Sequence, residues 1–186
     1  MTPLRLVGFS ANVQRPSKTR ALVETIGARV GRLRPVRFDM HDLVDAGSGV
    51  AAFSRDALTP SAERVIAAIE SADAIVVGTP VYKGSYTGLF KHIFDFVDPA
   101  ALAGRPVIVA ATGGGRRHAL VVEHQLRPLF GFFSALALPT SIYASNEDFS
   151  DGVLTDETTL ARIDQAAAEM AALATPRPGA KLTRVA

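Results

Sequence analysis

Residues 78–91 read G-T-P-V-Y-K-G-S-Y-T-G-L-F-K and follow the continuous apolar run Ala74-Ile75-Val76-Val77. An apolar run without polar alternation is typical of a parallel strand that is buried on both faces, and such a sheet carries helices on both sides. We expect Pro80 to stop the strand, and Gly84 and Gly88 to let the backbone approach a ligand closely. The chain is therefore predicted to be an α/β protein that turns at the carboxyl end of this strand, where open α/β sheets bind ligands.

Composition limits the classes of protein to consider. The chain has 186 residues, 48% of them hydrophobic, so we expect a single domain over 1–174 and a C-terminal tail over 175–186. A net charge of +2 does not indicate nucleic-acid binding, and the absence of cysteine excludes disulfides, thiolate metal sites and a cysteine nucleophile. Without a signal-peptide pattern or an apolar run of roughly 18 residues, we expect a cytoplasmic protein that does not enter the membrane.

Apolar runs and helical stripes alternate along the chain. Strands are predicted at 4–9, 36–40, 74–78, 107–111 and 141–144. Helices are predicted after residue 19, from Thr59-Pro60 to Ala72, and over 89–97, 118–135 and 158–173. Pro128 predicts an irregularity within the fourth of these helices. Residues 42–54 are expected to form a partly mobile loop. This alternation predicts a doubly wound, flavodoxin-like sheet of five parallel strands in the order 2-1-3-4-5.

Three loops follow strands that are neighbours in this order. Residues 10–19 are polar and lead into a helix, whose free amides and positive dipole end favour a phosphate, although Ser17 and Thr19 are otherwise simple helix caps. Residues 79–88 and 112–115 offer glycine backbone and Tyr82 to a flat ring. The alternative for Tyr82 is a core aromatic without a ligand role. Because the carboxyl ends of parallel strands meet at one edge, we expect the three loops to form one crevice.

The loops carry the motifs Gly8-Phe9-Ser10 with Arg15-Pro16-Ser17-Lys18-Thr19, then 79–91, then Ala111-Thr112-Gly113-Gly114. This combination resembles the NAD(P)H-dependent FMN reductase family, and it is most similar to the branch that supplies reduced flavin to two-component alkanesulfonate and methanesulfonate monooxygenases. Phe9 and Ala11-Asn12 depart from the usual first motif. The resemblance implies hydride transfer from NADPH, or alternatively NADH, to FMN, with no catalytic acid, base or nucleophile on the protein.

The resemblance also implies roles for individual residues. It places Ser10, Ser17, Lys18 and Thr19 at the FMN phosphate, Pro80, Val81, Tyr82, Lys83 and Ser85 along the isoalloxazine, and Thr112, Gly113 and Gly114 at its other edge. The alternative for Lys83 is a solvated side chain without a role in cofactor binding. Arg15 is a further candidate for cofactor binding and competes with Arg116 and Arg117 for the 2′-phosphate of NADPH, because a guanidinium suits phosphate. The alternative for Arg116 and Arg117 is an exposed pair on a flexible turn.

His124 aligns with the position at which some members of the resembled branch carry an extra residue. That residue produces a π-type bulge at a tetramer interface and is linked to loose flavin binding and to flavin transfer. The alternative is an ordinary surface or interface histidine. His41, His92 and His118 have no metal-ligand spacing, so no metal is expected. The surplus of phenylalanine in the third and fourth helices favours a homodimer or homotetramer.

The sequence is also compatible with two other functions. Flavodoxin-like reductases that hold FMN tightly and reduce quinones, azo dyes or chromate share the same loops. A flavodoxin-type electron carrier is disfavoured, because such carriers are strongly acidic and this chain is slightly basic. The preferred reading is an FMN reductase with an FMNH2-dependent monooxygenase as its partner.

Overall fold

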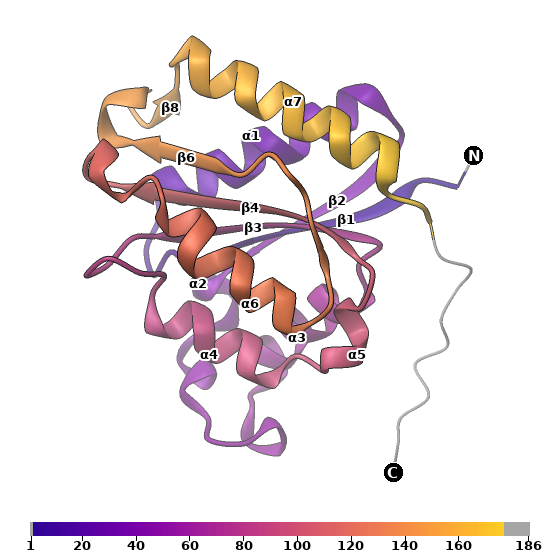
Figure 1. The fold of residues 1–186 in the computed structure, drawn as a ribbon. Helices are drawn as coiled ribbons and strands as arrows, with labels where there is room; N and C mark the ends of the chain where they lie inside the picture. Colours follow the sequence, from indigo (N-terminus) through magenta and orange to yellow (C-terminus); the bar gives the residue numbers. More distant parts are fainter. Residues whose placement is uncertain (1, 177–186) are drawn as a thin grey trace.

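A parallel sheet lies at the centre of the protein (Figure 1). The structure, a computed structural model, describes residues 2–176, so most of the expected tail at 175–186 lies outside the described residues. The strands of the sheet are β1 (Leu4–Ser10), β2 (Val36–Asp42), β3 (Ala74–Pro80), β4 (Pro106–Gly113), β5 (Leu136–Ala137) and β6 (Ile142–Ser145). They run in the order β2-β1-β3-β4-β5, with β6 also paired to β4, so the predicted flavodoxin-like order is confirmed.

Helices cover both faces of this sheet (Figure 1). The helices are α1 (Lys18–Leu33) and α7 (Glu157–Leu173) on one face, and α3 (Pro60–Ser71), α4 (Gly88–Phe96) and α6 (Arg127–Phe132) on the other, with the short α2 (Leu43–Ala46) and α5 (Pro99–Leu102). Within residues 2–176, no helix is long and apolar enough to cross a bilayer. The layers are those of a doubly wound α/β protein.

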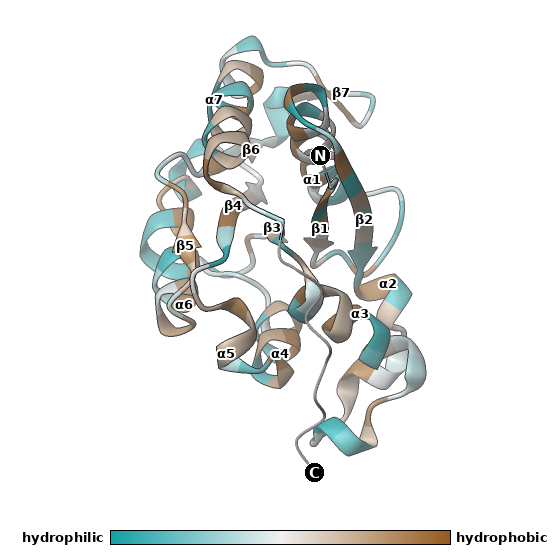
Figure 2. Ribbon diagram, turned by 90° about the vertical axis from the view of Figure 1, so that its right-hand side faces the viewer, coloured by the Kyte–Doolittle hydropathy of each residue, from teal (hydrophilic) through white to brown (hydrophobic). Residues whose placement is uncertain are grey.

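The central strands are buried on both sides, as their unbroken apolar runs predict. Ile75 and Val77 of β3 belong to the cluster beneath α3 and α4, while Ala74 and Val76 belong to the cluster beneath α1 and α7. Figure 2 shows hydrophobic residues along the strands and hydrophilic residues on the outward surfaces of the helices. Because both faces bury apolar area, the hydrophobic effect holds the two helical layers to a single sheet.

Side-chain caps begin the main helices. The hydroxyls of Ser17, Thr59 and Thr87 accept from the amides of Arg20, Ala62 and Phe90 at 3.3, 3.4 and 3.2 Å, and Asp156 accepts from the amide of Thr159 at 2.7 Å. Each cap satisfies an amide that has no partner within its own helix. The caps at Ser17 and Thr87 therefore set the points at which two loops of the crevice enter their helices.

Two local expectations about the first half of the chain are wrong. The strand β3 includes Pro80. Its pairing with β1 ends at Ser10↔Gly78, so the amide that proline lacks would have had no partner in β1. On the other side, the amide of Val81 still donates to the carbonyl of Thr112 in β4 at 2.7 Å. The expected loop at 42–54 contains α2 and a 3₁₀ turn, Ser48–Ala51. Asp42 and Asp45 begin α2 by exchanging side-chain-to-amide bonds of 3.0 Å.

The second half of the chain is more divided than predicted. The expected helix over 118–135 consists of a 3₁₀ turn (Arg116–His118), a π-helical segment (Val122–Leu126) and α6. The last strand expected at 141–144 is confirmed as β6, while β5, which pairs with the other end of β4, was not predicted. An antiparallel hairpin of β7 (Phe149–Ser150) and β8 (Val153–Leu154), and also α5, were not predicted.

Gly78 provides a test of the packing between β3 and α1. A Cβ atom at this position would lie 2.5 Å from Cγ2 of Val23, a stiff side chain on the buried face of α1. We expect Gly78→Ala to lower the free energy of unfolding by about 1–3 kcal/mol, measured by urea denaturation. Gly131→Ala in α6, where nothing lies within 4 Å of the added atom, is the matched control and should be neutral or stabilising. Equal stability of Gly78→Ala and wild type would contradict the packing described here.

Candidate functional site

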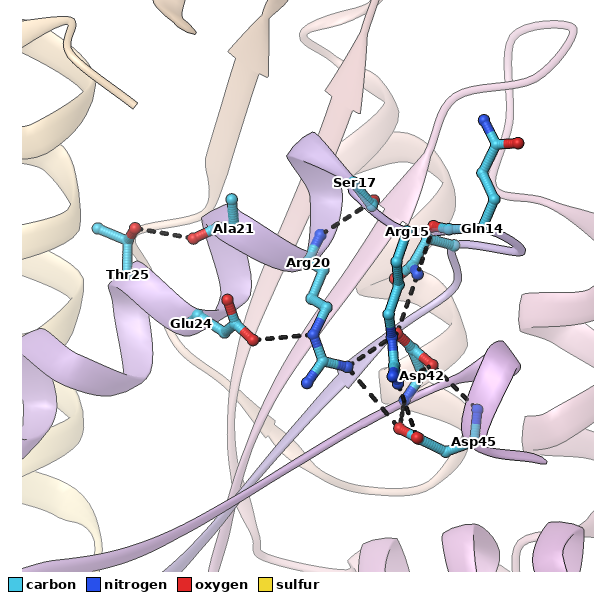
Figure 3. Close-up of polar contacts among 10 residues, drawn as sticks. Gln14, Arg15, Ser17, Arg20, Ala21, Glu24, Thr25, Asp42 and Asp45 are labelled. Atoms are coloured by element: carbon cyan, nitrogen blue, oxygen red, sulfur yellow. Dashed lines mark hydrogen bonds and ion pairs between the residues drawn. The ribbon is translucent and has the colours of Figure 1, made fainter. Parts of the chain in front are cut away.

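The loop between β1 and α1, residues 11–17, delivers polar groups to the amino end of a 16-residue helix (Figure 3). Ser17 caps the helix, Lys18 is its first residue and Thr19 is buried beside it. No acidic residue stands in the first turn of α1. The helix end therefore keeps its positive dipole and its free amides, an arrangement that attracts phosphate and other anions.

The turn after β3 is a tight reversal that leaves Tyr82 accessible. The amides and carbonyls of Tyr82 and Ser85 exchange bonds of 3.0 and 3.2 Å, with Lys83 and Gly84 between them at φ of 53° and 83°. A positive φ is the left-handed conformation that Gly84 adopts without strain. The side chain of Ser85 donates to Gln125 in the π-helical segment at 3.2 Å, and Tyr82 is 58% exposed. The turn thus presents an aromatic ring beside the end of the sheet.

The turn after β4 is held by Tyr143 on β6. The Tyr143 hydroxyl donates to the carbonyl of Gly115 at 2.5 Å and lies 2.3 Å from the position that a Cβ on Gly113 would occupy. A side chain at residue 113 would therefore displace the tyrosine. On the preceding residue, the hydroxyl of Thr112 is 2.6 Å from the hydroxyl of Thr19, which joins this turn to the start of α1.

A fourth loop, which follows β6, also reaches the site and was missed from the sequence. Lys18 donates to Oδ1 of Asn146 at 3.0 Å, and its ammonium lies 5.5 Å from the ring centroid of Phe149. The signal was available, because residues 145–150 read S-N-E-D-F-S directly after a predicted strand. The prediction included only the loops after the first, third and fourth strands.

Two adjoining cavities of about 190 Å³ and 340 Å³ lie between these loops. Lys18, Pro80, Tyr82 and Asn146 line both of them. The smaller is completed by Val81, Thr112, Gly113, Gly114, Ser145 and Phe149, and the larger by Asn12, Val13, Gln14, Pro16, Ser17 and Thr19. The sheet thus brings together the phosphate-binding and ring-binding candidates of three separate loops.

The polar atoms around these cavities fit a phosphorylated flavin. Within residues 2–176, Ser10 Oγ, Asn12 Oδ1 and Ser145 Oγ are buried without a hydrogen-bond partner, and Asn12 and Ser145 line the cavities. Buried polar atoms in folded proteins are nearly always bonded, so these atoms await a ligand or water. Serine hydroxyls can donate to phosphate oxygens, and the Asn12 carbonyl can accept from a ribityl hydroxyl.

Four of the predicted cofactor-binding residues lie outside the lining of the two cavities. Lys83 and Ser85 belong to the turn, but among the described residues they line neither cavity. Arg15 directs its guanidinium to Asp42 and Asp45, with bonds of 2.8 Å and 2.7 Å (Figure 3). Its position on the first loop is as expected, but the structure shows it engaged by carboxylates. Ser10 lies at the base of the loop and is fully buried.

The π-helical segment Val122–Leu126 contains His124, which is exposed, while Val122 and Leu126 point into the core. Glu123 of the same segment accepts from Arg127 at 2.6 Å and from Ser141 at 2.5 Å. These bonds anchor the segment to α6 and to the start of β6. Through Gln125 and Ser85 the segment also contacts the turn that carries Tyr82.

The two arginines that follow the glycine turn lie in the 3₁₀ turn at its far side. Arg116 donates to Asp148 at 3.3 Å, and Nε of Arg117 lies 3.3 Å from Nε2 of His118. Arg116 also lines a separate cleft of about 380 Å³ between the π-helical segment, β6 and α7, together with Arg162. Neither arginine lines the two cavities, so any contact with a nucleotide phosphate would be made beyond the glycine turn.

Comparisons with known proteins agree with this geometry. Residues 4–150 match the family described as NADPH-dependent FMN reductase. The chain is 45% identical over 172 residues to the NADH-dependent FMN reductase SfnF of Pseudomonas fluorescens, covering 92% of both chains. It is 43% identical to an FMN reductase (NADPH) of Pseudomonas aeruginosa, covering 92% of this chain and 93% of that protein. A solved oxidoreductase from Corynebacterium diphtheriae superposes with a TM-score of 0.83 at 35% identity, covering 92% and 97% of the two chains.

Glu123 predicts a measurable acid sensitivity of the π-helical segment. The bonds from Arg127 lower its pKa to about 2, with burial opposing the shift and Ser141 adding to it. Because the folded pKa lies below the unfolded value of about 4.3, the stabilisation is complete above that value and is lost as the pH falls toward 2. We expect wild type to lose more stability than Glu123→Gln between pH 5 and pH 3, measured by urea denaturation. Parallel curves for the two proteins would contradict this role, and Glu147→Gln, an exposed change on a nearby loop, is the control.

Proposed function

The chain belongs to the NADPH-dependent FMN reductase family, and we propose that it transfers hydride from a nicotinamide nucleotide to FMN at the cavities beneath the sheet's carboxyl edge. The observation that carries this proposal is the meeting of a helix amino end, an accessible tyrosine and a glycine turn around one site. The first suits a phosphate, and the other two suit a flat ring. No metal is needed for this chemistry.

The phosphate of FMN is assigned to the start of α1. Its dipole, the amides of the first turn and the ammonium of Lys18 all favour a dianion there. Ser17 and Thr19 line the larger cavity. Ser10, at the base of the loop, holds a buried hydroxyl without a hydrogen-bond partner among the described residues, and it is proposed to support the phosphate site from there. Lys18 is the charged side chain that lines both cavities, so it lies between the phosphate region and the ring region.

The isoalloxazine is assigned to the space between the two remaining turns. Tyr82 and Val81 offer one side, and the backbone of Gly113 and Gly114 offers a polar edge without side chains in the way. When bound, FMN supplies the hydride-accepting atom, so the protein contributes orientation, hydrogen bonds and access. Tyr143 fixes the glycine turn through Gly115 and thereby keeps that edge in place.

We further propose that FMN is a substrate that exchanges with solvent, and that reduced FMN passes to a monooxygenase of the two-component type. Tyr82 is 58% exposed, and Lys18 is the charged side chain common to both cavities. A shallow site with few charged contacts favours reversible binding. A π-helical segment joined to the flavin turn through Ser85 and Gln125 supports the same view, because such segments often occur at functional sites.

The nicotinamide nucleotide is proposed to reach the flavin from the side of the glycine turn. Arg116 and Arg162 line the separate cleft beyond this turn, and a guanidinium there suits the phosphates of NADH or the additional 2′-phosphate of NADPH. The relatives include reductases named for each nucleotide, so both are candidate hydride donors. Discrimination between them is assigned to Arg116, with Arg117 as the neighbouring alternative.

A homodimer or homotetramer is proposed for the active form. Leu120, Phe132 and Leu136 are 63%, 71% and 53% exposed around the π-helical segment and α6, and His124 lies among them in sequence. Large apolar side chains exposed in one region of the chain favour association with a second copy. This surface adjoins Gln125, so assembly there would also border the flavin turn.

The direct test is a titration of the purified protein with FMN, followed by NADH and NADPH oxidation with and without added FMN. We expect sub-stoichiometric FMN after purification, reversible binding, and turnover that rises with added FMN. Firmly held, stoichiometric FMN with turnover only on quinones or azo dyes would favour a reductase with a prosthetic flavin instead. Absence of flavin binding would reject both forms of the proposal.

Lys18 is the second test. Lys18→Met removes the ammonium while keeping an apolar stem, and we expect about a tenfold loss of FMN affinity because one charge-assisted contact is lost. Arg29→Met, a change of equal charge on the same helix at its ion pair with Asp164, should leave FMN affinity unchanged. The measurement is quenching of flavin fluorescence. If Lys18→Met and wild type bind FMN with equal affinity, Lys18 does not contact the phosphate.

A further inference from the structure

A buried carboxylate lies beneath the loop that joins β1 to α1. Asp42 is the last residue of β2, which is paired with β1 in the sheet, and its side chain is fully buried. Figure 3 shows that side chains from the loop and from the first turn of α1 both converge on it. The position of Asp42 is set by the sheet register, Ser10↔Asp42, and not by the loop itself.

The loop and the helix donate to this one carboxylate. Arg15 donates from Nε to Oδ2 and from its terminal nitrogen to Oδ1, each at 2.8 Å. Asn12 donates to Oδ2 at 3.0 Å, and Arg20 of α1 donates to the same oxygen at 2.8 Å. The amide of Asp45 completes the set with a bond of 3.0 Å to Oδ1. Asp42 thus fixes the loop at two residues and the helix at one.

The two arginines that bind Asp42 have further carboxylate partners, and these lie outside the two cavities. Asp45 accepts a second bond from Arg15 at 2.7 Å, and Glu24 accepts from Arg20 at 2.8 Å. Burial would raise the pKa of Asp42, but the bonds from Arg15, Asn12, the Asp45 amide and Arg20 outweigh it and hold this pKa well below its usual range. The carboxylate is therefore charged throughout the neutral and mildly acidic range.

We propose that Asp42 is the positioning residue of the FMN phosphate site: it clamps the 11–17 loop and the first turn of α1 in the shape that receives the phosphate. This inference rests on the proposed function. Asp42 lines neither cavity, so it acts through Asn12, whose free Oδ1 remains at the site, and through the α1 end that carries Lys18. The arginines stabilise the loop, and the phosphate is left to amides, hydroxyls and one lysine.

The test compares two ligands that differ only by the phosphate, FMN and riboflavin, in wild type and in Asp42→Asn. We expect about a tenfold loss of FMN affinity with riboflavin affinity within about twofold of wild type, because buried ion pairs are costly to break and the loop serves the phosphate. The substitution also removes a negative charge near a dianion, which by itself would strengthen FMN binding. A loss against that electrostatic trend therefore identifies loop geometry as the cause.

Controls separate the possible outcomes. Glu24→Gln breaks only the outer pair with Arg20 and should change neither ligand's affinity. If Asp42→Asn does not fold, Asp45→Asn, which breaks the second bond of Arg15 and likewise removes a negative charge, carries the same test with a smaller expected loss of about threefold for FMN.

Three results would overturn the proposal. Unchanged FMN affinity in Asp42→Asn would show that the clamp is dispensable, and an equal loss for both ligands would show a general structural role. Tighter FMN binding in Asp42→Asn would show that Arg15, once released, is itself a phosphate ligand. Failure of wild type to bind either flavin is a different result, because it rejects the proposed function rather than the clamp.

Discussion

The parallel register of the sheet is the constraint on which the site depends. Because Ser10 pairs with Gly78 and Gly78 pairs with Ala110, the carboxyl ends of β1, β3 and β4 finish at one level. The loops that follow these strands therefore share one space at that edge. The same register places Asp42 beside Ser10, where it can hold the first loop.

Charge is distributed unevenly in this space, and the distribution bears on function. Arg15 of the first loop and Arg20 of α1 are paired with Asp42 at the end of β2. Lys18 faces the cavities with a neutral amide and an aromatic ring as neighbours. A phosphate bound there meets a helix dipole and one ammonium rather than a cluster of guanidinium groups. This arrangement supports the proposal that FMN binds with moderate affinity and exchanges with solvent.

Most of the fold and three of the four loops could be predicted from local patterns. These patterns are the buried apolar runs, the helix caps Ser17 and Thr59, and the glycine turns after strands. Each is determined by interactions within a few residues of sequence. The misses depend on distant parts of the chain. Pro80 stays in its strand because β1 has already ended, and β5 pairs with β4 ahead of the predicted strand β6. The contact between Arg15 and Asp42 joins residues that are 27 apart in the sequence, and the role of Arg15 at the cofactor stays a prediction. Asn146 joins the site only because β6 lies beside β4.

The most direct measurement of the central claim is a crystal structure of the protein soaked with FMN. The account predicts the phosphate at the amino end of α1, within hydrogen-bonding distance of the backbone amides of Ser17 to Thr19, and the isoalloxazine between Tyr82 and the Gly113–Gly114 turn. It also predicts that the bonds between Asp42 and the loop remain unchanged. A phosphate bound instead in the cleft of Arg116 and Arg162, or a guanidinium of Arg15 turned away from Asp42 to the phosphate, would contradict it.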